Sequence, residues 1–399
     1  MNIFVINSGS SSIKYKLFQM PAARLLCSGV AERIGMDQAA LTHKTYVNGI
    51  ERSFSYKQDI PNYQVGLQKI NQLLTDEIIG VIKSLTEIQV VGHRIVHGGE
   101  KFSGSIRITP EVKQDLKLLF KLAPLHNPPG YRCIEVAEEL FTNATQVAVF
   151  DTAFHQTMPP KAFRFAIPDS FYTEHNIRAY GFHGTSHKYV SEQAANYLGS
   201  KSLKLISMHL GNGCSITSIK DGRSIDTSMG FGPLSGLVMG TRSGDLDPTV
   251  IFYLVETLGY DLQQVSDLLN KQSGLLGLTG FSDTRDITRA LENGDANAKL
   301  AYDIYCYHIK KYIGSYTASL NGLDAVIFTG GVGENNSLVR EMVCKEMEYL
   351  GLELDTVKNN GQLEGITEIN KHEARVKILV ITTNEELEIA KQCFALVSG

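Results

Sequence analysis

The sequence lacks several features that would assign it to a membrane, a secretory route or a nucleic acid. No apolar stretch approaches the roughly 18 residues that cross a membrane, and the N-terminal residues show no positively charged region followed by a long apolar one, as a signal peptide would. There is no run of lysine and arginine, and the formal net charge is −4. A nucleic-acid partner would require a basic face. We therefore expect a cytoplasmic protein that binds neither membranes nor nucleic acids.

Closely spaced cysteine pairs are also missing. The six cysteines form no CxxC motif and lie at positions 27, 133, 214, 306, 344 and 393. In a cytoplasmic chain such isolated cysteines are typical of free thiols. The histidine pairs His93/His97 and His183/His187 lie in glycine-rich segments rather than on an evident helix. We therefore expect no disulfide and no metal centre built from histidine.

The remaining composition is that of a globular protein with two domains. The chain has 399 residues, of which 43% are hydrophobic and 20% charged. A chain of this length is too long to fold around a single ordinary hydrophobic core. A buried-looking strand ends at Asp151, and there we place the domain boundary. We expect an N-terminal domain over residues 1–150 and a C-terminal domain over 151–384, with a helix over 385–399 that packs back on the first.

Two segments of the chain resemble each other, one in each half. Residues 7–12 read Asn-Ser-Gly-Ser-Ser-Ser and residues 210–215 read Leu-Gly-Asn-Gly-Cys-Ser, and each lies between two short apolar runs. A strand, a tight glycine-rich turn and a returning strand form a hairpin whose backbone N–H groups can face an anion. Its presence in both halves predicts a duplicated α/β domain with phosphate bound between the copies.

Periodicity predicts several further elements. A helix is expected over residues 63–85, with one apolar stripe formed by Leu67, Ile70, Leu74 and Ile78. A strand is expected over 89–91, and helices are expected to begin at Pro110 and near Pro128.

The second half contains one long helix and one long loop. The helix is expected near 295–319, with His308 on an apolar, tyrosine-rich face, where it is a core or interface residue. Residues 228–248 include five glycines without helical or strand periodicity. Because the segment is also rich in large apolar residues, it reads as a packed active-site loop rather than a disordered one.

Five charged or polar residues stand where an active site would gather them. Arg94 and Arg242 each lie between glycines, in what we interpret as turns that present a guanidinium to phosphate or carboxylate. Asp151 ends a strand, His183 precedes a glycine, and Glu385 opens the final helix. Taken singly, each has a plain structural alternative: a surface ion pair, or a helix cap favoured by the dipole. The glycine-rich turn at 330–335, between a strand and a helix, could hold nucleotide phosphate or ribose.

Longer motifs resemble those of the acetate kinase family over residues 2 to about 392. The segments that carry the resemblance are 6–12, 92–100, 123–129, 150–155, 209–213, 240–248 and 383–386. Small departures from the family pattern occur at Ser8, Gly130 and Thr284, and none of them removes a charged group.

The resemblance implies a fold, a reaction and an assembly. The fold would be the duplicated, two-domain α/β fold of acetate and sugar kinases, heat-shock chaperones and actin (the ASKHA, actin-like ATPase or ribonuclease H-like fold), with an interdomain nucleotide cleft. The reaction would be reversible, in-line phosphoryl transfer from ATP to acetate, giving acetyl phosphate and ADP. Mg²⁺ would be the cofactor, with Mn²⁺ as an alternative, and the protein would be a homodimer.

The resemblance also implies site residues. Asp151, His183 and Arg242 would be catalytic, Arg94 would bind the acyl substrate, and Asn7 and Glu385 would serve Mg²⁺. The nucleotide and its phosphates would be held by Ser12, Lys14, His209, Leu210, Gly211, Asn212, Gly213, Asp283, Thr284, Arg285, Gly330, Gly331, Val332, Gly333 and Glu334.

Two points come from the chemistry of the residues. Acetate is already ionised at neutral pH, so Asp151 has no proton to remove and is expected to orient Arg94 or metal-bound water. The acyl pocket is expected from the apolar neighbours Val96, Leu125, Phe182 and Pro233.

The alternatives are a propionate kinase of the same family, since one methylene is worth only about 0.8 kcal/mol, and, less favoured, a butyrate kinase. A nucleotide-gated binding protein would dispense with both arginines.

Overall fold

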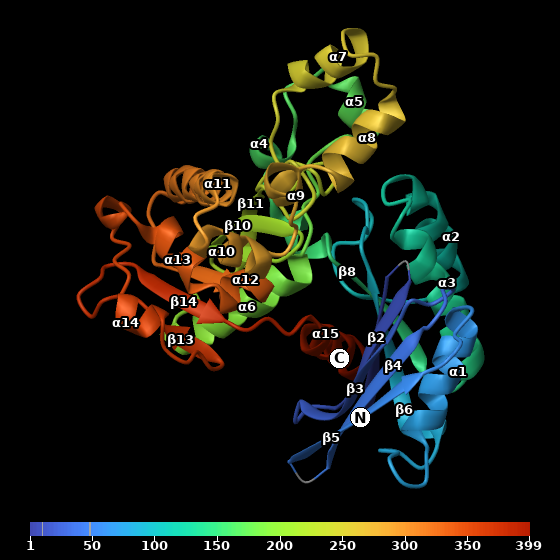
Figure 1. Ribbon diagram of the computed structural model, residues 1–399. Coiled ribbons are helices and arrows are strands. Elements are labelled where there is room, and N and C mark those ends of the chain that lie inside the picture. Colours follow the sequence, from blue (N-terminus) through green and yellow to red (C-terminus); the bar gives the residue numbers. More distant parts are fainter. Residues whose placement is uncertain (10, 48) are drawn as a thin grey trace. The chain divides into compact units, whose positions relative to one another are not determined.

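The computed structural model describes residues 1–9, 11–47 and 49–399, and the chain forms two compact units (Figure 1). The first comprises Met1–Ala153 together with Asn384–Gly399, and the second comprises Phe154–Thr383. Ser10 of the first glycine-rich motif lies outside the described residues. Within the described chain, no helix is long and apolar enough to cross a membrane.

The first unit is built on an eight-stranded sheet in the order β5-β4-β3-β2-β1-β6-β8-β7. Strands β1 to β5 form an antiparallel meander, whereas β6 runs parallel to β1, and β8 runs parallel to β6. The strands are β1 (Asn2–Ser8), β2 (Ser12–Gln19), β3 (Arg24–Glu32), β4 (Ala40–Val47), β5 (Ile50–Lys57), β6 (Ile88–Ile95), β7 (Ile106–Arg107) and β8 (Thr145–Phe150).

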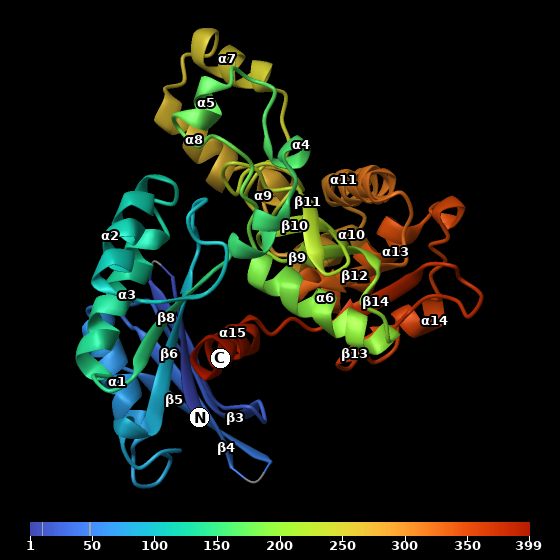
Figure 2. The same cartoon turned by 180° about the vertical axis from the view of Figure 1, so that it is seen from behind.

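Helices cover both faces of this sheet (Figures 1 and 2). They are α1 (Tyr63–Leu74), α2 (Pro110–Leu118), α3 (Asn127–Leu140) and α15 (Glu385–Ser398). Successive side chains of a strand point to opposite faces. Phe4 and Ile6 of β1 therefore pack on the side of α1 and α3, while Ile3 and Val5 pack against Ile389 of α15.

The structure confirms the helix starts at Pro110 and near Pro128 but corrects the helix expected over 63–85. Helix α1 ends at Leu74, and Ile78, placed on its buried stripe, is 86% exposed. The reason is local: the Asp76 carboxylate accepts hydrogen bonds from the backbone N–H groups of Ile78 and Ile79, which forms a turn instead of another helical turn.

The strand expected over 89–91 is longer than predicted, and this changes the setting of Arg94. Strand β6 extends through Ile95, so Arg94 lies in a strand and not in a turn. Gly92 is needed for another reason. A Cβ atom there would lie 2.7 Å from the Cys393 sulfur and 3.0 Å from a methyl carbon of Ile389, because α15 crosses this strand closely.

The second unit is built on a six-stranded sheet in the order β11-β10-β9-β12-β14-β13, in which β12 is parallel to both β9 and β14. Its strands are β9 (Lys204–Leu210), β10 (Cys214–Lys220), β11 (Arg223–Thr227), β12 (Ala325–Thr329), β13 (Ile366–Glu368) and β14 (Lys377–Ile381). Its helices are α4 (Pro160–Phe163), α5 (Ser170–Thr173), α6 (Gly184–Leu198), α7 (Pro248–Glu256), α8 (Leu262–Lys271), α9 (Gly274–Thr279), α10 (Thr284–Glu292), α11 (Ala296–Leu320), α12 (Gly330–Asn335), α13 (Ser337–Cys344) and α14 (Thr356–Asn359).

Helix α6 packs through Val190 and Ala194 against alternate residues of β9, β10, β12 and β14. His187, which was not expected on a helix, belongs to α6 and is fully buried. His308 of α11 is half-buried. Residues 228–247, all described, form a loop without helix or strand in which Met229, Leu237 and Met239 are fully buried. This loop is packed, as predicted.

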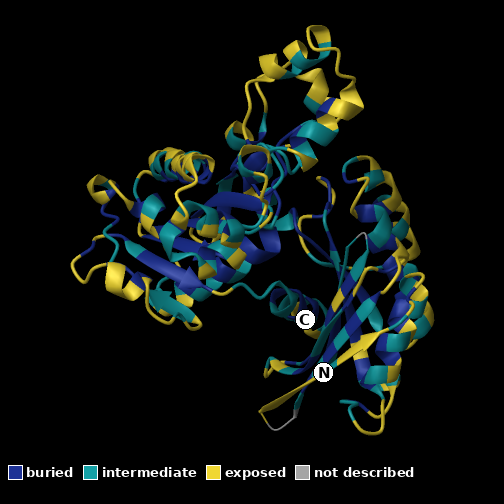
Figure 3. Cartoon of the chain, viewed as in Figure 1, coloured by how far each residue is buried: buried dark blue, intermediate teal, exposed yellow. Residues whose placement is uncertain are grey.

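The strands on either side of each glycine-rich motif pair as the predicted hairpins, β1 with β2 in the first unit and β9 with β10 in the second. All six cysteines are buried free thiols, as expected. Burial is concentrated in the central strands of each sheet (Figure 3).

Candidate active site

The parallel strands of the first unit and the start of α15 bring four polar residues to one edge of the sheet. Asn7 lies at the carboxyl end of β1, Arg94 at that of β6, and Asp151 directly follows β8. Carboxyl ends of parallel strands meet at one edge, where open α/β sheets gather ligand groups. Glu385, the first residue of α15, reaches the same place.

Arg94 is the centre of this cluster. Its Nε donates to Asp151 Oδ1 at 3.1 Å, its Nη2 donates to Asp151 Oδ2, and its Nη1 donates to Asn7 Oδ1 at 3.1 Å. Glu385 Oε2 lies 3.8 Å from Arg94 Nε. Asp151 is only 1% exposed. The guanidinium is therefore fixed in plane by a bidentate carboxylate, a geometry specific to arginine.

The charges in the cluster shift one another's ionisation. Burial alone would lower the pKa of Arg94, but the carboxylates of Asp151 and Glu385 raise it above its ordinary value, so the guanidinium stays charged. Burial raises the pKa of Glu385 to about 7; Arg94 opposes this rise, while Asp151 and Glu386 add to it. The site therefore concentrates charge of both signs in a poorly solvated place.

Strand β2 contributes lysines beside the start of α15. Lys16 Nζ lies 2.9 Å from Glu386 Oε2 and donates to Asn384 Oδ1 at 3.0 Å. Lys14, two residues earlier in the strand, is exposed, and Ser12 is half-buried. The pairing of Lys16 fastens the N-terminus of α15 to the sheet, and this holds Glu385 in position.

Asn7 and Glu385 supply the donor atoms that Mg²⁺ prefers. Both are oxygen donors, and both contact the guanidinium of Arg94. Mg²⁺ is commonly held by one or two carboxylates together with substrate phosphates and water. Among the described residues no cluster of three or more histidine, cysteine, aspartate or glutamate side chains could hold a metal ion. The donor set therefore fits an ion that takes its other ligands from a nucleotide.

In the second unit, His183 precedes α6 in an uncommon conformation. Its φ of 56° lies in the left-handed region, a position that costs energy and is often found at functional sites. Its ring stacks on His209 with centroids 4.3 Å apart, and its Nδ1 lies 2.9 Å from Ser215 Oγ. A Cβ atom at Gly213 would lie 3.5 Å from the His183 ring and 3.7 Å from Arg242 Nη1. Both side chains therefore lie beside the hairpin turn.

Arg242 is carried by the packed loop. Its Nη1 donates to the carbonyl of Pro233 at 3.0 Å, and burial lowers its pKa. Asp245 closes the loop by accepting from the Gly236 N–H at 2.7 Å and from the Tyr312 hydroxyl of α11 at 2.6 Å. The loop is thereby tied to a long helix, which fixes the arginine.

The four predicted acyl-pocket residues differ in exposure. Val96 directly follows β6 and is half-buried, whereas Leu125 is 69% exposed. Phe182 is buried beside His183, and Pro233 is half-buried. Their role as a pocket stays a prediction.

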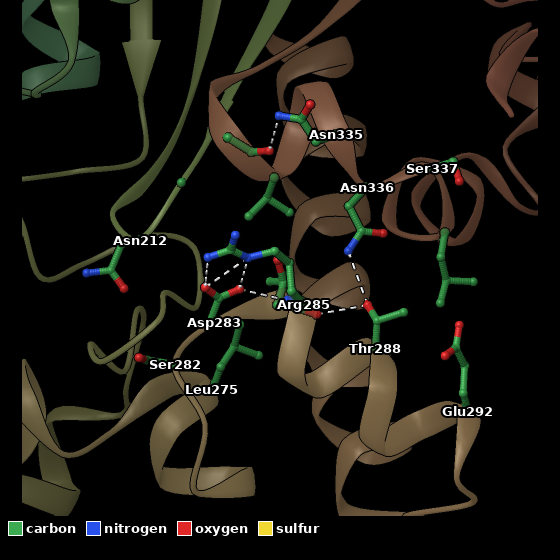
Figure 4. A pocket seen from close by; sticks show the side chains of 15 residues that line it. Asn212, Leu275, Ser282, Asp283, Arg285, Thr288, Glu292, Asn335, Asn336 and Ser337 are labelled. Atoms are coloured by element: carbon green, nitrogen blue, oxygen red, sulfur yellow. Dashed lines mark hydrogen bonds and ion pairs between the residues drawn. The ribbon is translucent and has the colours of Figure 1, made fainter. Parts of the chain in front are cut away.

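A cavity of about 1010 Å³ opens in the second unit beside the hairpin turn, α10 and α12 (Figure 4). The predicted nucleotide residues that line it are Gly211, Asn212, Asp283, Thr284, Arg285, Gly331 and Val332. Asp283 caps α10 and pairs with the largely exposed Arg285, whose Nη2 lies 2.6 Å from Asp283 Oδ2. These separate motifs therefore meet at one hollow.

The other predicted nucleotide residues of this unit, His209, Leu210, Gly213, Gly330, Gly333 and Glu334, do not line the cavity. Glu334 has an internal role: its Oε1 accepts hydrogen bonds from the backbone N–H groups of Gly330 at 2.9 Å and Thr383 at 3.1 Å. Glu334 therefore stabilises the glycine-rich turn through hydrogen bonds to the backbone.

Asn335, at the end of the glycine-rich turn predicted over 330–335, also lines the cavity. Sequence reasoning missed the other residues of the cavity wall, namely Leu275, Ser282, Thr288, Glu292, Asn336, Ser337 and Leu338. Asn336 Nδ2 lies 3.2 Å from the Tyr302 hydroxyl, which lies 2.7 Å from Thr288 Oγ1. Their one sequence signal is position: they lie close to the predicted motifs at 283–285 and 330–334.

Comparison with known proteins matches the acetokinase family over residues 2–391. The acetate kinase of Flavobacterium johnsoniae is 54% identical over 399 residues, covering 100% of both chains. That of Thermotoga maritima is 50% identical over 404 residues, covering 100% of this chain and 99% of its own.

Solved structures agree with these matches. The acetate kinase of Porphyromonas gingivalis superposes with a TM-score of 0.93 at 44% identity, covering 99% of each chain. The propionate kinase of Francisella tularensis superposes with a TM-score of 0.91 at 42% identity, covering 98% of each chain. The two mixed α/β units therefore have the fold of the acetate and propionate kinases. With a match over almost its whole length, this chain belongs to the acetokinase family.

Proposed function

We propose that this protein is an acetate kinase, which transfers a phosphoryl group reversibly between ATP and acetate to give ADP and acetyl phosphate. The observation that carries the proposal is the fixed guanidinium of Arg94, held by Asp151 and Asn7 at the carboxyl ends of parallel strands. A planar, charged fork in such a position suits a carboxylate substrate. Because ATP is the co-substrate, we infer that the protein works in the cytoplasm.

The proposed roles follow from the needs of phosphoryl transfer. The reaction requires in-line positioning and neutralisation of charge on the transferred group. Arg94 would bind the acyl carboxylate, and Arg242 and His183 would stabilise the transferred phosphoryl group. Acetate has no proton to lose at neutral pH, so Asp151 acts by orienting Arg94 and not as a base.

The nucleotide is proposed to bind in the cavity lined by Asn212, Asp283 and Arg285, with Lys14 serving its phosphates. Asn7 and Glu385 would hold Mg²⁺, for which Mn²⁺ could substitute. When bound, the ion would neutralise phosphate charge during transfer. The glycines of the turn at Gly330 allow the backbone to approach the nucleotide closely.

Acyl specificity is the finer part of the proposal. A propionate kinase is the alternative, and the similarity to the Francisella tularensis enzyme keeps it open. We favour acetate because Val96 follows the strand of Arg94 and narrows the space beside it. Hydroxylamine trapping of acyl phosphate with acetate, propionate and butyrate side by side tests this. ATP turnover that needs no added acid would overturn the kinase proposal, and a higher kcat/KM for propionate would overturn the acetate preference.

We also propose a homodimer formed through the second unit. Helix α7 has no buried residue, and its Phe252 and Tyr253 are 58% and 57% exposed (Figure 3). Leu258 and Leu262, which follow it, are also exposed. Contiguous exposed apolar side chains mark interaction surfaces. Sedimentation should give twice the chain mass for the protein and the chain mass for Phe252→Asp; a monomeric unmodified protein would refute the dimer.

A further inference from the structure

A chain of hydrogen bonds runs from the interior of the second unit to His183. His187 Nδ1 lies 2.9 Å from Ser207 Oγ, and His187 Nε2 lies 2.7 Å from Ser215 Oγ. Ser215 Oγ in turn lies 2.9 Å from His183 Nδ1. Ser207, Ser215 and His187 are fully buried. Neither the family resemblance nor the proposed reaction assigns a role to these three residues.

The chemistry of the groups couples their protons. A hydroxyl has one hydrogen to donate, and a neutral imidazole has one donor nitrogen and one acceptor nitrogen. Burial lowers the pKa of His187 well below its usual value, so this ring is neutral. If each hydrogen is used within the chain, every donor points the same way, either toward His183 or toward Ser207.

Two features select the direction toward His183. Under the proposed function, His183 faces an anionic phosphoryl group, so its Nε2 must carry a hydrogen. Arg242 lies close by: a Cβ atom at Gly213 would be 3.5 Å from His183 Nε2 and 3.7 Å from Arg242 Nη1. This positive charge disfavours a second one on the imidazole. A neutral ring with hydrogen on Nε2 must accept at Nδ1.

We propose that Ser215, His187 and Ser207 are positioning residues that hold His183 as its neutral Nε2–H tautomer. Ser207 donates to His187 Nδ1, His187 Nε2–H donates to Ser215, and the Ser215 hydroxyl donates to His183 Nδ1. His183 then presents a fixed, uncharged N–H donor to the phosphoryl group. The identity of the anion rests on the proposed function, and the order of donors and acceptors rests on the three hydrogen bonds.

Strand β10 offers a matched pair of variants. Ser215→Ala removes the donor to His183, whereas Ser218→Ala removes a hydroxyl that is equally buried and has no hydrogen-bond partner among the described residues. We expect kcat to fall about 10- to 100-fold in Ser215→Ala, as for other residues that orient a catalytic group, with KM for ATP and acetate within about 2-fold. Ser218→Ala should retain the unmodified kcat. Equal effects of the two variants would overturn the positioning role.

Nitrogen NMR of protein labelled at histidine gives a second readout that needs no turnover. The signals of His183 are assigned by their loss in His183→Gln. We expect hydrogen on Nε2 and none on Nδ1 in the unmodified protein, with and without ADP, and a mixture of tautomers in Ser215→Ala. Two protonated nitrogens, or hydrogen on Nδ1, would overturn the proposal. Absence of acetate-dependent turnover would instead overturn the proposed function, so the two failures are distinguishable.

Discussion

Asp151 accepts two hydrogen bonds from one edge of the Arg94 guanidinium, with 3.1 Å between Nε and Oδ1 and a second contact from Nη2 to Oδ2. The two residues lie at the carboxyl ends of the adjacent parallel strands β6 and β8. Both carboxylate oxygens are therefore engaged in fixing the arginine. An aspartate with this geometry suits an orienting role better than proton transfer.

Asp151→Asn should lower acyl phosphate formation by about 10²-fold or more at every pH from about 5 to about 9. The amide keeps the shape but loses the charge and one acceptor oxygen. The measurement is hydroxylamine trapping across this range in both proteins. Recovery of the variant at high pH would contradict the orienting role, because hydroxide would then replace a missing base.

Val96→Ala should raise kcat/KM for propionate relative to acetate by roughly 5-fold, on the order of 1 kcal/mol. Val96 directly follows strand β6, two residues after Arg94, and is half-buried, so we expect it beside the acyl group that Arg94 binds. Removing two methyl groups there would make room for a longer acid. The measurement is competition between the two acids. An unchanged ratio of kcat/KM for propionate and acetate would show that Val96 does not line the acyl pocket.

Arg340→Met should raise KM for ATP by roughly 10-fold, with KM for acetate little changed. The buried guanidinium donates through Nη1 to the carbonyls of Gly333 at 2.9 Å and Glu334 at 3.0 Å, and through Nε to Asn359 at 2.7 Å. It thereby holds the end of the glycine-rich turn. The control is Arg289→Met on the exposed face of α10. Steady-state kinetics with each substrate varied would decide, and equal rises in both KM values would count against this role.

Gly330→Ala should destabilise the second unit by about 2 kcal/mol or more. Gly330 has a φ of 77°, and a Cβ atom there would lie 2.7 Å from the carbonyl oxygen of Leu210. At Gly331 a Cβ atom would meet nothing within 4 Å, so Gly331→Ala is the stability control. Chemical denaturation of both variants makes the comparison, and similar midpoints would mean that the turn can relax.

The first unit should lose stability as the pH falls from about 6.5 to about 4 through His43. Burial lowers the pKa of this histidine from 6.5 to about 4. The unfolded chain therefore takes up more protons across this window, and the free energy of unfolding falls by roughly 2 kcal/mol at pH 5. His43→Gln, which can still bind the Tyr15 hydroxyl, should make the dependence measured by urea denaturation shallower. It should not remove the dependence, because burial also lowers the pKa of His93 and His97 of the same unit to about 4. Identical curves for the two proteins would refute the assignment.

Local sequence patterns predicted the elements that are determined by residues close together in the chain. The hairpins around both glycine-rich motifs, the proline helix starts and the strand before Asp151 need only near neighbours in the chain. Gly92 led to the wrong prediction of a turn, because the reason for a glycine there lies far away in the sequence. It makes room for Cys393 and Ile389 of α15, and the strand continues through Arg94. A glycine required by tertiary packing looks the same in a sequence as one required by a turn.

The residues of the cavity wall also divide into those that the sequence could predict and those that it could not. Asp283 and the turn at Gly331 belong to motifs that could be recognised. Thr288 and Asn336, in contrast, reach the cavity wall because α10 and α13 pack against α11, where Tyr302 contacts both side chains. Such residues have no signature of their own, and only the folded chain brings them to the site.

The placement of α15 has a consequence for synthesis of the protein. Residues 384–399 follow the whole second unit in the chain, yet they complete the first unit, covering Ile3, Val5 and Val147 with Ile389 and Cys393. On the ribosome, this face of the first sheet stays open until the second unit has been translated. Glu385 arrives at Arg94 in the same step. A nascent chain would therefore have no complete reaction centre, and the exposed face is where a chaperone would be expected to bind it.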